Sequence, residues 1–402
     1  MTRPHISDAQ RQARLAQRHR LAPGAHTDDI AGIADSLVAL HSSDPATVHL
    51  AAVARMATPS IAVVEAALYE QRSVVRHHGM RRTLWVFTPE VARAVHASCT
   101  AALAAAEWKQ LLKWVTANDL PDPQAWVAQA RANTLAALHR LGPTSARALG
   151  KAVPALTTRL LMGTGKWAAE QASHTRLLLN LGFDAEIVRT APTGSWVSSE
   201  YQWAVMADWL PGGITGMDPA AARDELVARY LQAFGPATAA DVQWWTGWTL
   251  APVKAALAAL AAVEVGLDDG SVGWVLPDDV PGGAPTESEA AGELWVALLP
   301  GLDPTAMGWK QRGFYLGDLG TFGGPLFDRN GNVGPTVWAN GQVVGGWAQR
   351  ADGTVVFELL RPVDRATQAA IANAAERLRT VVGGTRVTPR FPTPLQMSLA
   401  VS

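Results

Sequence analysis

Cationic and imidazole side chains crowd into one short stretch of this sequence, VVRHHGMRRTLWVF, which spans residues 74–87. It contains three arginines and two histidines: Arg76, His77, His78, Arg81 and Arg82. Guanidinium groups form charge-assisted hydrogen bonds to phosphate oxygens, and imidazoles can add neutral hydrogen bonds. We therefore expect these five side chains to contact a polyanion such as a nucleic-acid backbone. The alternative is that the arginines are solvated or pair with nearby carboxylates.

A second candidate for chemistry is the polar run Leu40-His41-Ser42-Ser43-Asp44-Pro45. A histidine that is neutral near pH 7 accepts a proton from water, so His41 is a candidate base. Ser43 is placed to orient that water, and Asp44 could stabilise positive charge on a sugar. Aspartate followed by proline is also a common helix start, and we favour this capping role for Asp44. From spacing alone, a capping network is the simpler interpretation of all three residues.

A smaller basic cluster, Met307-Gly308-Trp309-Lys310-Gln311-Arg312, carries an aromatic residue beside Lys310 and Arg312. These side chains could stack on a base or contact a phosphate, but a surface turn explains the pattern equally well. Gly-Thr-Gly-Lys at 163–166 lacks the spacing of a phosphate loop, and no dinucleotide fingerprint occurs. His77-His78 has no third ligand near it in the sequence. We therefore expect neither a metal nor a cofactor.

The composition restricts the class of protein. With 402 residues and a net charge of −1, any attraction to nucleic acid must come from local clustering rather than bulk charge. The single cysteine, Cys99, excludes an intramolecular disulfide and fits a reducing compartment. No stretch approaches 18 uninterrupted apolar residues. We expect a cytoplasmic monomer that does not contact a membrane.

The elements that position the first basic stretch follow a recognisable order. A helix begins near Thr27, a second begins at Asp44-Pro45, and a third begins at Pro59. Two predicted strands, 74–75 and 83–87, come next. Three helices followed by a hairpin are typical of a winged helix. The residues between the strands would then form the wing, with Gly79 at positive φ at its tip, and a wing of this kind contacts DNA.

The same order recurs twice further along the chain. HRLGPTSARALGKAV (139–153) and QAFGPATAADVQWWT (232–246) share a Gly-Pro turn, a Ser/Thr cap and a short apolar helix. The first stretch lies between predicted helices at 124–140 and 166–181, and strands at 185–190 and 196–204 follow. The second lies between predicted helices at 220–233 and 252–262, and strands at 263–267 and 272–276 follow. We interpret these as a second and a third winged-helix unit, with a long helix at 90–116 linking the first two.

The residue pattern changes after the turn-rich segment 277–289 and becomes typical of strands. Alternating apolar runs and the turns at Asn340-Gly341 and Asp352-Gly353 predict strands, including strands at 313–318 and 385–391, around a helix at 365–380. The predicted fold class is α+β: three tandem winged-helix units followed by a β-rich, barrel-like domain. We divide the chain at 1–89 (N-terminal arm and first unit), 90–210 (linking helix and second unit), 219–280 (third unit) and 290–402 (C-terminal domain).

Histidine is concentrated near the N-terminus. Seven of the ten histidines fall within the first 78 residues: His5, His19, His26, His41, His49, His77 and His78. We attribute this clustering to chance and expect most of these side chains to be exposed on the surface.

Three stretches carry a resemblance to a known family: ADSLVALHSSDPATVHLAAVARM, LYEQRSVVRHHGMRRTLWVFTPE and GPTVWANGQVVGGWAQR. They resemble the bacterial winged-helix DNA glycosylases, over about residues 20–395. The resemblance implies tandem winged helices and a C-terminal β-barrel around a C-shaped groove for DNA. It also implies hydrolysis of the N-glycosidic bond of alkylated purines, including bulky adducts and crosslinks. Where that family has Gln-x-Gln or Gln-x-Asp, this sequence has His41 and Ser43.

Three functions therefore remain open. The first is a repair glycosylase that acts on damaged double-stranded DNA, with His41 and Ser43 holding the attacking water. An alkylated purine is already a cationic leaving group, so no strong general acid is required. The second is a non-catalytic winged-helix DNA-binding protein or regulator that has lost the glycosylase motif. The third is a hydrolase or ligand-binding protein unrelated to DNA.

Overall fold

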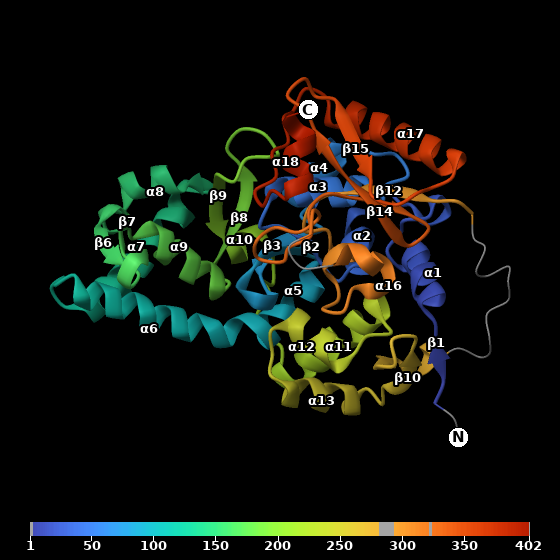
Figure 1. Ribbon diagram of the computed structural model, residues 1–402. Coiled ribbons are helices and arrows are strands. Elements are labelled where there is room, and N and C mark those ends of the chain that lie inside the picture. The colour runs from blue at the N-terminus through green and yellow to red at the C-terminus, as the bar shows by residue number, and fades with distance from the viewer. Residues whose placement is uncertain (1–2, 281–292, 321–323, 402) are drawn as a thin grey trace.

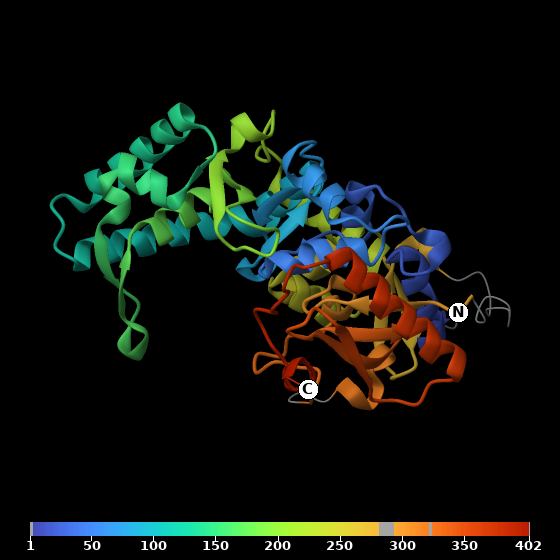
Figure 2. The ribbon, with the colours of Figure 1, turned by 90° about the horizontal axis from the view of Figure 1, so that it is seen from above.

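A computed structural model describes residues 3–280, 293–320 and 324–401 and shows a mixed α and β protein (Figure 1). The helices and strands between α6 and β9 form an elongated lobe that extends from a larger body (Figures 1 and 2). The lobe has an apolar core drawn entirely from residues between Leu111 and Val205. The larger body is built around a core with side chains from the first unit, the third unit and the C-terminal sheet.

The first unit contains a three-stranded antiparallel sheet with the order β2-β4-β3. Its elements are α2 (Ile30–Ser36), β2 (Leu40–His41), α3 (Pro45–Val53), α4 (Ile61–Tyr69), β3 (Val75–His78) and β4 (Leu84–Phe87). Helix α3 begins where the sequence predicts, because Asp44 caps it and Pro45 occupies its first position. The residues after α2 form the short strand β2 rather than a polar interruption, so His41 lies within a sheet.

The connection between β3 and β4 is shorter than predicted. Arg76, His77 and His78 belong to strand β3 and are buried, so their assignment to an exposed wing loop is wrong. The turn itself contains Gly79 and a 3-10 turn at Met80–Arg82. Gly79 has a φ of −145°, and the positive φ values fall instead on Arg81 (54°) and Arg82 (63°). The prediction failed because both faces of this hairpin are covered by other elements, which a local pattern does not reveal.

The second unit repeats this arrangement with the sheet order β5-β9-β8. It follows α5 (Pro89–Val95), a π-helical turn (His96–Thr100) and α6 (Ala101–Ala117), and consists of α7 (Pro123–Leu141), β5 (Thr144–Ser145), α8 (Ala146–Ala152), α9 (His174–Phe183), β8 (Ile187–Pro192) and β9 (Tyr201–Val205). The helix predicted at 166–181 begins only at His174. Strands β6 (Arg159–Met162) and β7 (Ala169–Ala172) precede it as a projecting hairpin (Figure 2). The positive φ values of Gly163 and Gly165 allow the chain to reverse there.

The third unit repeats the order again after α10 (Met206–Trp209). It consists of α11 (Pro219–Phe234), α12 (Ala239–Thr246), α13 (Leu250–Ala259), β10 (Val263–Leu267) and β11 (Val272–Val275). Ala237 pairs with Trp274 of β11 and so takes the position that β2 and β5 have in their units. The N-terminal arm packs on this unit, because β1 (His5–Ile6) pairs in parallel with β10 and leads into α1 (Asp8–Arg18).

The C-terminal sheet is open rather than barrel-like. Its antiparallel order is β12-β13-β14-β15, and among the described residues the two outer strands do not pair with each other. The elements are β12 (Val296–Leu299), α15 (Pro304–Met307), α16 (Gly313–Leu316), β13 (Thr336–Ala339), β14 (Gln342–Gln349), β15 (Val355–Leu359), α17 (Arg365–Val382) and α18 (Pro394–Val401). The strand predicted at 313–318 is the short helix α16, and no strand forms at 385–391. Most of the break predicted at 277–289 lies outside the described residues.

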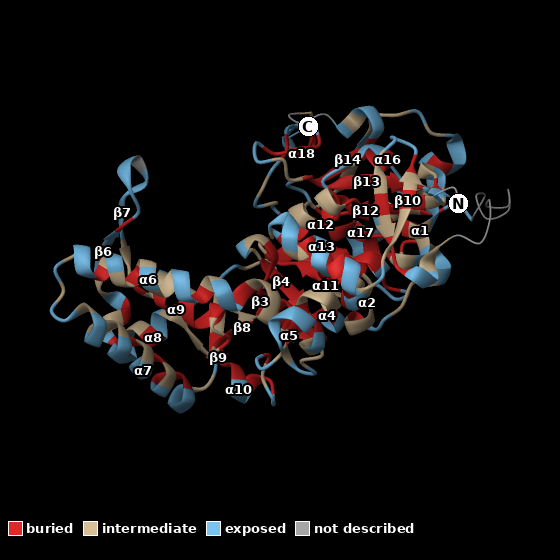
Figure 3. Cartoon of the chain, turned by 90° about the horizontal axis from the view of Figure 1, so that it is seen from below, coloured by how far each residue is buried: buried red, intermediate tan, exposed pale blue. Residues whose placement is uncertain are grey.

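Buried residues are concentrated in the interior of the larger body (Figure 3). Five of the seven N-terminal histidines are buried, against our expectation of exposure: His19, His41, His49, His77 and His78. Arg55 and Asp303 form a fully buried ion pair with N–O distances of 2.8 and 2.9 Å. This pair ties the end of α3 to the segment after β12 and so fixes the first unit on the C-terminal domain.

Candidate nucleic-acid interface

A cleft of about 1050 Å³ opens between the first unit, the second unit and the segment that follows α17. Four arginines line it, one or more from each part: Arg82, Arg147, Arg189 and Arg390. Of the described residues on its wall, Glu200 alone is acidic. A hollow that gathers one sign of charge in a nearly neutral protein attracts a polyanion.

The turn between β2 and α3 lies on this cleft through Ser42, Ser43 and Pro45. Ser42 N donates to the Leu84 carbonyl (2.8 Å), and Ser42 Oγ accepts from Arg76 Nε (3.1 Å). These bonds hold the turn against β3 and β4, so its hydroxyl groups are presented from a rigid sheet.

Asp44 is occupied as a structural group. Its Oδ1 accepts from Ala46 N (3.1 Å), which confirms the predicted cap, and its Oδ2 accepts from Arg390 N (2.8 Å). Burial raises the pKa of this carboxyl group, and the two backbone donors oppose that shift. Arg390 also donates to the Ser43 carbonyl (3.3 Å). Asp44 therefore joins the C-terminal segment to the cleft instead of facing into it.

His41 faces away from the cleft. It pairs with Trp85 across the sheet, and the two rings meet edge-on at 4.4 Å. Neighbouring strand residues point to opposite faces, so His41 and Ser42 lie on opposite sides of β2. Burial, with a smaller contribution from the charge of Arg81, lowers the pKa of His41 to about 3. Nδ1 accepts from Ser43 N (3.3 Å), so the proton of this neutral imidazole is on Nε2.

The residues of β3 have structural roles. Arg76 is buried, donates to Tyr69 Oη (2.7 Å) and lies 4.7 Å from the ring centroid of Tyr201. It fixes Ser42 and is not exposed to a phosphate as predicted. His77 contacts His96 at 3.3 Å, and His78 stacks on Phe183.

Burial keeps the pKa of both histidines well below its ordinary value, so neither adds positive charge. Their placement in an exposed loop is therefore wrong, and a contact with DNA stays a prediction, since His78 borders the cleft.

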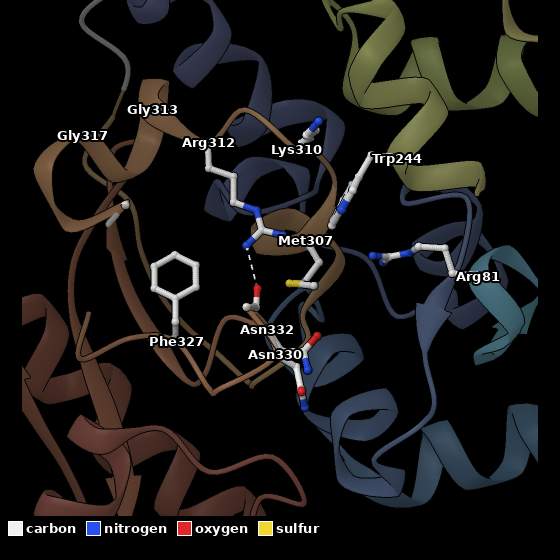
Figure 4. Close-up of a pocket in the computed structure, with 12 residues that line it drawn as sticks. Arg81, Trp244, Met307, Lys310, Arg312, Gly313, Gly317, Phe327, Asn330 and Asn332 are labelled. Atoms are coloured by element: carbon white, nitrogen blue, oxygen red, sulfur yellow. Dashed lines mark hydrogen bonds between the residues drawn. The ribbon is translucent and has the colours of Figure 1, made fainter. Parts of the chain in front are cut away.

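Arg81 and Arg82 diverge although they are adjacent. Arg82 lies on the rim of the cleft, half exposed, and pairs with Glu107 at 2.6 Å. Arg81 instead lines a separate hollow of about 570 Å³ together with Trp244, Lys310 and Arg312 (Figure 4). We call this hollow the basic pocket. It brings together two basic clusters that are more than two hundred residues apart in the sequence.

Comparison with known proteins settles the family. The profile described as "DNA glycosylase AlkZ-like" matches residues 34–381. The chain belongs to this AlkZ-like family. A solved structure, the Streptomyces sahachiroi DNA glycosylase AlkZ, superposes with a TM-score of 0.66 over 92% of this chain and 97% of that chain, at 18% sequence identity. That likeness supports the fold. No curated protein sequence matches.

Three arginines of this AlkZ-like cleft were not found from the sequence: Arg147, Arg189 and Arg390. Arg390 meets the β2–α3 turn over a separation of 346 residues, which no local pattern reveals. Burial lowers the pKa of Arg189 to about 10, and its guanidinium lies over the ring of Trp203. Arg147 did carry a signal. It occupies the first turn of α8, where the helix dipole disfavours a cation, so an external anion is a natural partner.

Within residues 3–280, 293–320 and 324–401, no three histidine, cysteine, aspartate or glutamate side chains are grouped as metal ligands would be. In the same ranges, no helix combines the length and apolar character needed to cross a bilayer.

Proposed function

We propose that this AlkZ-like protein binds damaged double-stranded DNA in the cleft and hydrolyses the N-glycosidic bond of alkylated purines there. Family membership supports DNA as the partner. The observation that carries the proposal is the cleft itself, where four arginines surround the hydroxyl groups of the β2–α3 turn. The same turn carries the two positions of the family motif, His41 and Ser43.

The three repeats of helix, strand, two helices and hairpin are, in this proposal, three winged helices. Their sheets share one order, with the short first strand beside the last strand. The domain limits 1–89, 90–210, 219–280 and 290–402 follow from the same repeats. Two of the units face one cleft, so a duplex lying in it would contact both.

The chemistry requires a placed water and tolerance of positive charge on the sugar. Water oxygen bonds to C1′ of the deoxyribose while the glycosidic electron pair leaves with the purine. This neutralises the alkylated base, and a proton passes from the water to solvent. Ser43 Oγ is the hydroxyl that orients the water. Glu200, as the acidic residue of the cleft, is a candidate to stabilise the oxocarbenium-like sugar.

His41 is a positioning residue in this scheme rather than a base. Its pKa of about 3 makes it a weak proton acceptor, and its Nδ1 lone pair already accepts from Ser43 N. The imidazole holds the backbone of Ser43 from behind the sheet. This replaces our expectation from the sequence that His41 itself activates water.

A base-release assay tests the proposal. We expect the protein to release alkylpurine from a duplex with N7-alkylguanine, and Ser43→Ala to slow release about 100-fold with little change in DNA affinity. Ser199→Ala is the matched control, because Ser199 is another hydroxyl on the cleft wall away from the turn. Small and bulky adducts are compared to define the lesion. Equal rates for the two serine variants would remove Ser43 from the mechanism.

A second function, DNA binding without catalysis, is favoured by one observation. His41 and Ser43 stand where the family has two glutamines or a glutamine and an aspartate, and His41 is turned into the core. Tight binding without release of any adduct would establish this function. Absence of duplex binding would exclude both.

A further inference from the structure

The basic pocket lies on the side of the β3–β4 turn where Arg81 emerges, whereas Arg82 points to the cleft. Arg81 also lies close enough to His41 for its charge to act on the imidazole. The opposite wall comes from the C-terminal domain, which contributes Lys310, Arg312 and the amide side chains of Asn330 and Asn332 (Figure 4). Trp244 comes from α12 of the third unit, so the pocket is a junction of the first unit, the third unit and the C-terminal domain.

The cations of the pocket have no carboxylate partner within the described part of the chain. Arg81 and Arg312 both lie against the Trp244 indole, and burial together with the like charge of Arg312 lowers the pKa of Arg81 to about 10. Nε of Arg81 is buried and makes no hydrogen bond there. Two guanidinium groups in one pocket without a counter-charge are unfavourable, and an anion bound in that pocket would offset the cost.

Carboxylates on the segments that line the pocket already have partners, and Asp318 pairs with Arg361. Asp241 accepts from the backbone N–H groups of Lys310 and Gln311 (2.8 and 3.0 Å). Asp328 accepts from Asn330 N, Asn332 N and the Asn332 amide. Asp241 thus shapes the loop that carries Lys310 and Arg312, and Asp328 shapes the loop that carries the two asparagines of the pocket.

Trp244 orients the guanidinium groups and indicates the kind of ligand. The guanidinium carbons of Arg81 and Arg312 lie 4.1 and 5.1 Å from the ring centroid of Trp244. Arg312 is further fixed by donating to the Trp309 and Gly331 carbonyls (2.9 and 3.3 Å). A guanidinium held by its face presents its N–H edge to planar oxygen acceptors. The indole is covered by these cations, so a phosphate fits the pocket better than a stacked base.

We infer that the basic pocket binds a phosphate group, namely a backbone phosphodiester of the DNA strand that passes the β3–β4 turn. That the phosphate belongs to DNA rests on the proposed function. That the pocket binds a phosphate does not. Arg81 and Arg312 hold the phosphate oxygens, and Lys310, whose side chain is exposed, adds a third positive charge. A phosphate bound there would hold the DNA strand on one side of β2. This is the side on which His41 lies and from which it supports the β2–α3 turn.

The first arm of the test measures affinity for a labelled undamaged duplex between about 50 and 200 mM salt. Lys310→Gln and Arg312→Gln should each flatten the plot of log affinity against log salt by roughly 1, as loss of one phosphate contact predicts. Arg377→Gln removes an exposed arginine of α17 that lines neither the cleft nor the pocket, and should leave the slope unchanged. Lys310→Gln keeps the test valid if Arg312→Gln disturbs folding.

The second arm needs no DNA. Inorganic phosphate or deoxythymidine 5′-monophosphate should raise the Tm of the wild type and of Arg377→Gln, but not of Arg312→Gln. Loss of the Tm shift together with a flattened slope supports a DNA phosphate in the pocket. A Tm shift with unchanged slopes would overturn DNA as the source and leave free phosphate. Unchanged slopes without any Tm shift would overturn the assignment of a phosphate to the basic pocket, even where the wild type binds and repairs DNA.

Discussion

The turns β2–α3 and β5–α8 occupy the same place in the first and second units and face the same cleft, yet their chemistry differs. The first presents hydroxyl groups from a buried, closely bonded turn, and its cap Asp44 is covered by the C-terminal segment. The second exposes Arg147 in the first turn of α8. In the proposed function, one fold supplies a reacting group in one copy and a cationic anchor in the other.

The units also differ in how they are held. The first unit contributes side chains to the core of the larger body and is fixed there by the Arg55–Asp303 pair. The second unit has its own core, although one face of β8 and β9 also contacts the shared core. A turn that performs chemistry needs the firmer support, because its geometry must be kept within a fraction of an ångström.

The largest expected difference between the units is their response to acid. His19, His41 and His49 lie in the larger body, and burial lowers the pKa of each to about 3. As pH falls below 6.5, these histidines bind protons in the unfolded chain but stay neutral in the folded protein. The free energy of unfolding therefore decreases until pH reaches about 3. Two pH units below 6.5, three such groups together cost about 8 kcal/mol of unfolding free energy.

Amide hydrogen exchange across this pH range checks the prediction. Protection should fall in α3 and β4 while α7 and α9 of the second unit stay protected. His49→Gln should reduce the pH dependence of the free energy of unfolding, because one of the neutral buried imidazoles is gone. Equal loss of protection in both units would contradict the distinction between them.

The next effect comes from the buried ion pair. Asp303→Asn leaves Arg55 buried without its counter-charge, and breaking such a pair costs about 3–5 kcal/mol. Urea unfolding should therefore shift to lower denaturant, with the second unit unfolding in a later, separate step. Glu376→Gln breaks an exposed pair with Arg379, which solvent screens, and should leave the urea midpoint nearly unchanged. A single transition for Asp303→Asn would mean that the lobe depends on the larger body.

Local signals in the sequence were sufficient for some of the regular elements. Strand β10 matches its predicted range 263–267, and Asp44 caps α3 as expected. The failures arose where tertiary contacts decide. Alternation of polar and apolar residues cannot show that both faces of β3 are covered, so the sequence pattern predicts a loop for His77 and His78, which belong to the strand.

The candidate site was predictable only in part, for the same reason. Arg81, Lys310 and Arg312 were identified by their charge, but that they share one pocket depends on how the C-terminal loop folds back. Arg390 reaches Asp44 across nearly the whole chain. The chemical type of a residue can be read from a sequence, whereas its partner at this distance cannot.

The smallest expected effect separates anchoring from chemistry. Arg147→Gln should weaken duplex binding and flatten its salt dependence by roughly 1, while the single-turnover rate of base release at saturating enzyme stays unchanged. Ser43→Ala should instead slow base release and leave the affinity for the duplex nearly unchanged. Because Arg147 opposes the dipole of α8, its replacement should not lower the Tm, so weaker binding cannot come from unfolding. A slower release rate for Arg147→Gln, with affinity intact, would show that the second unit takes part in the reaction and would end the division of roles between the two turns.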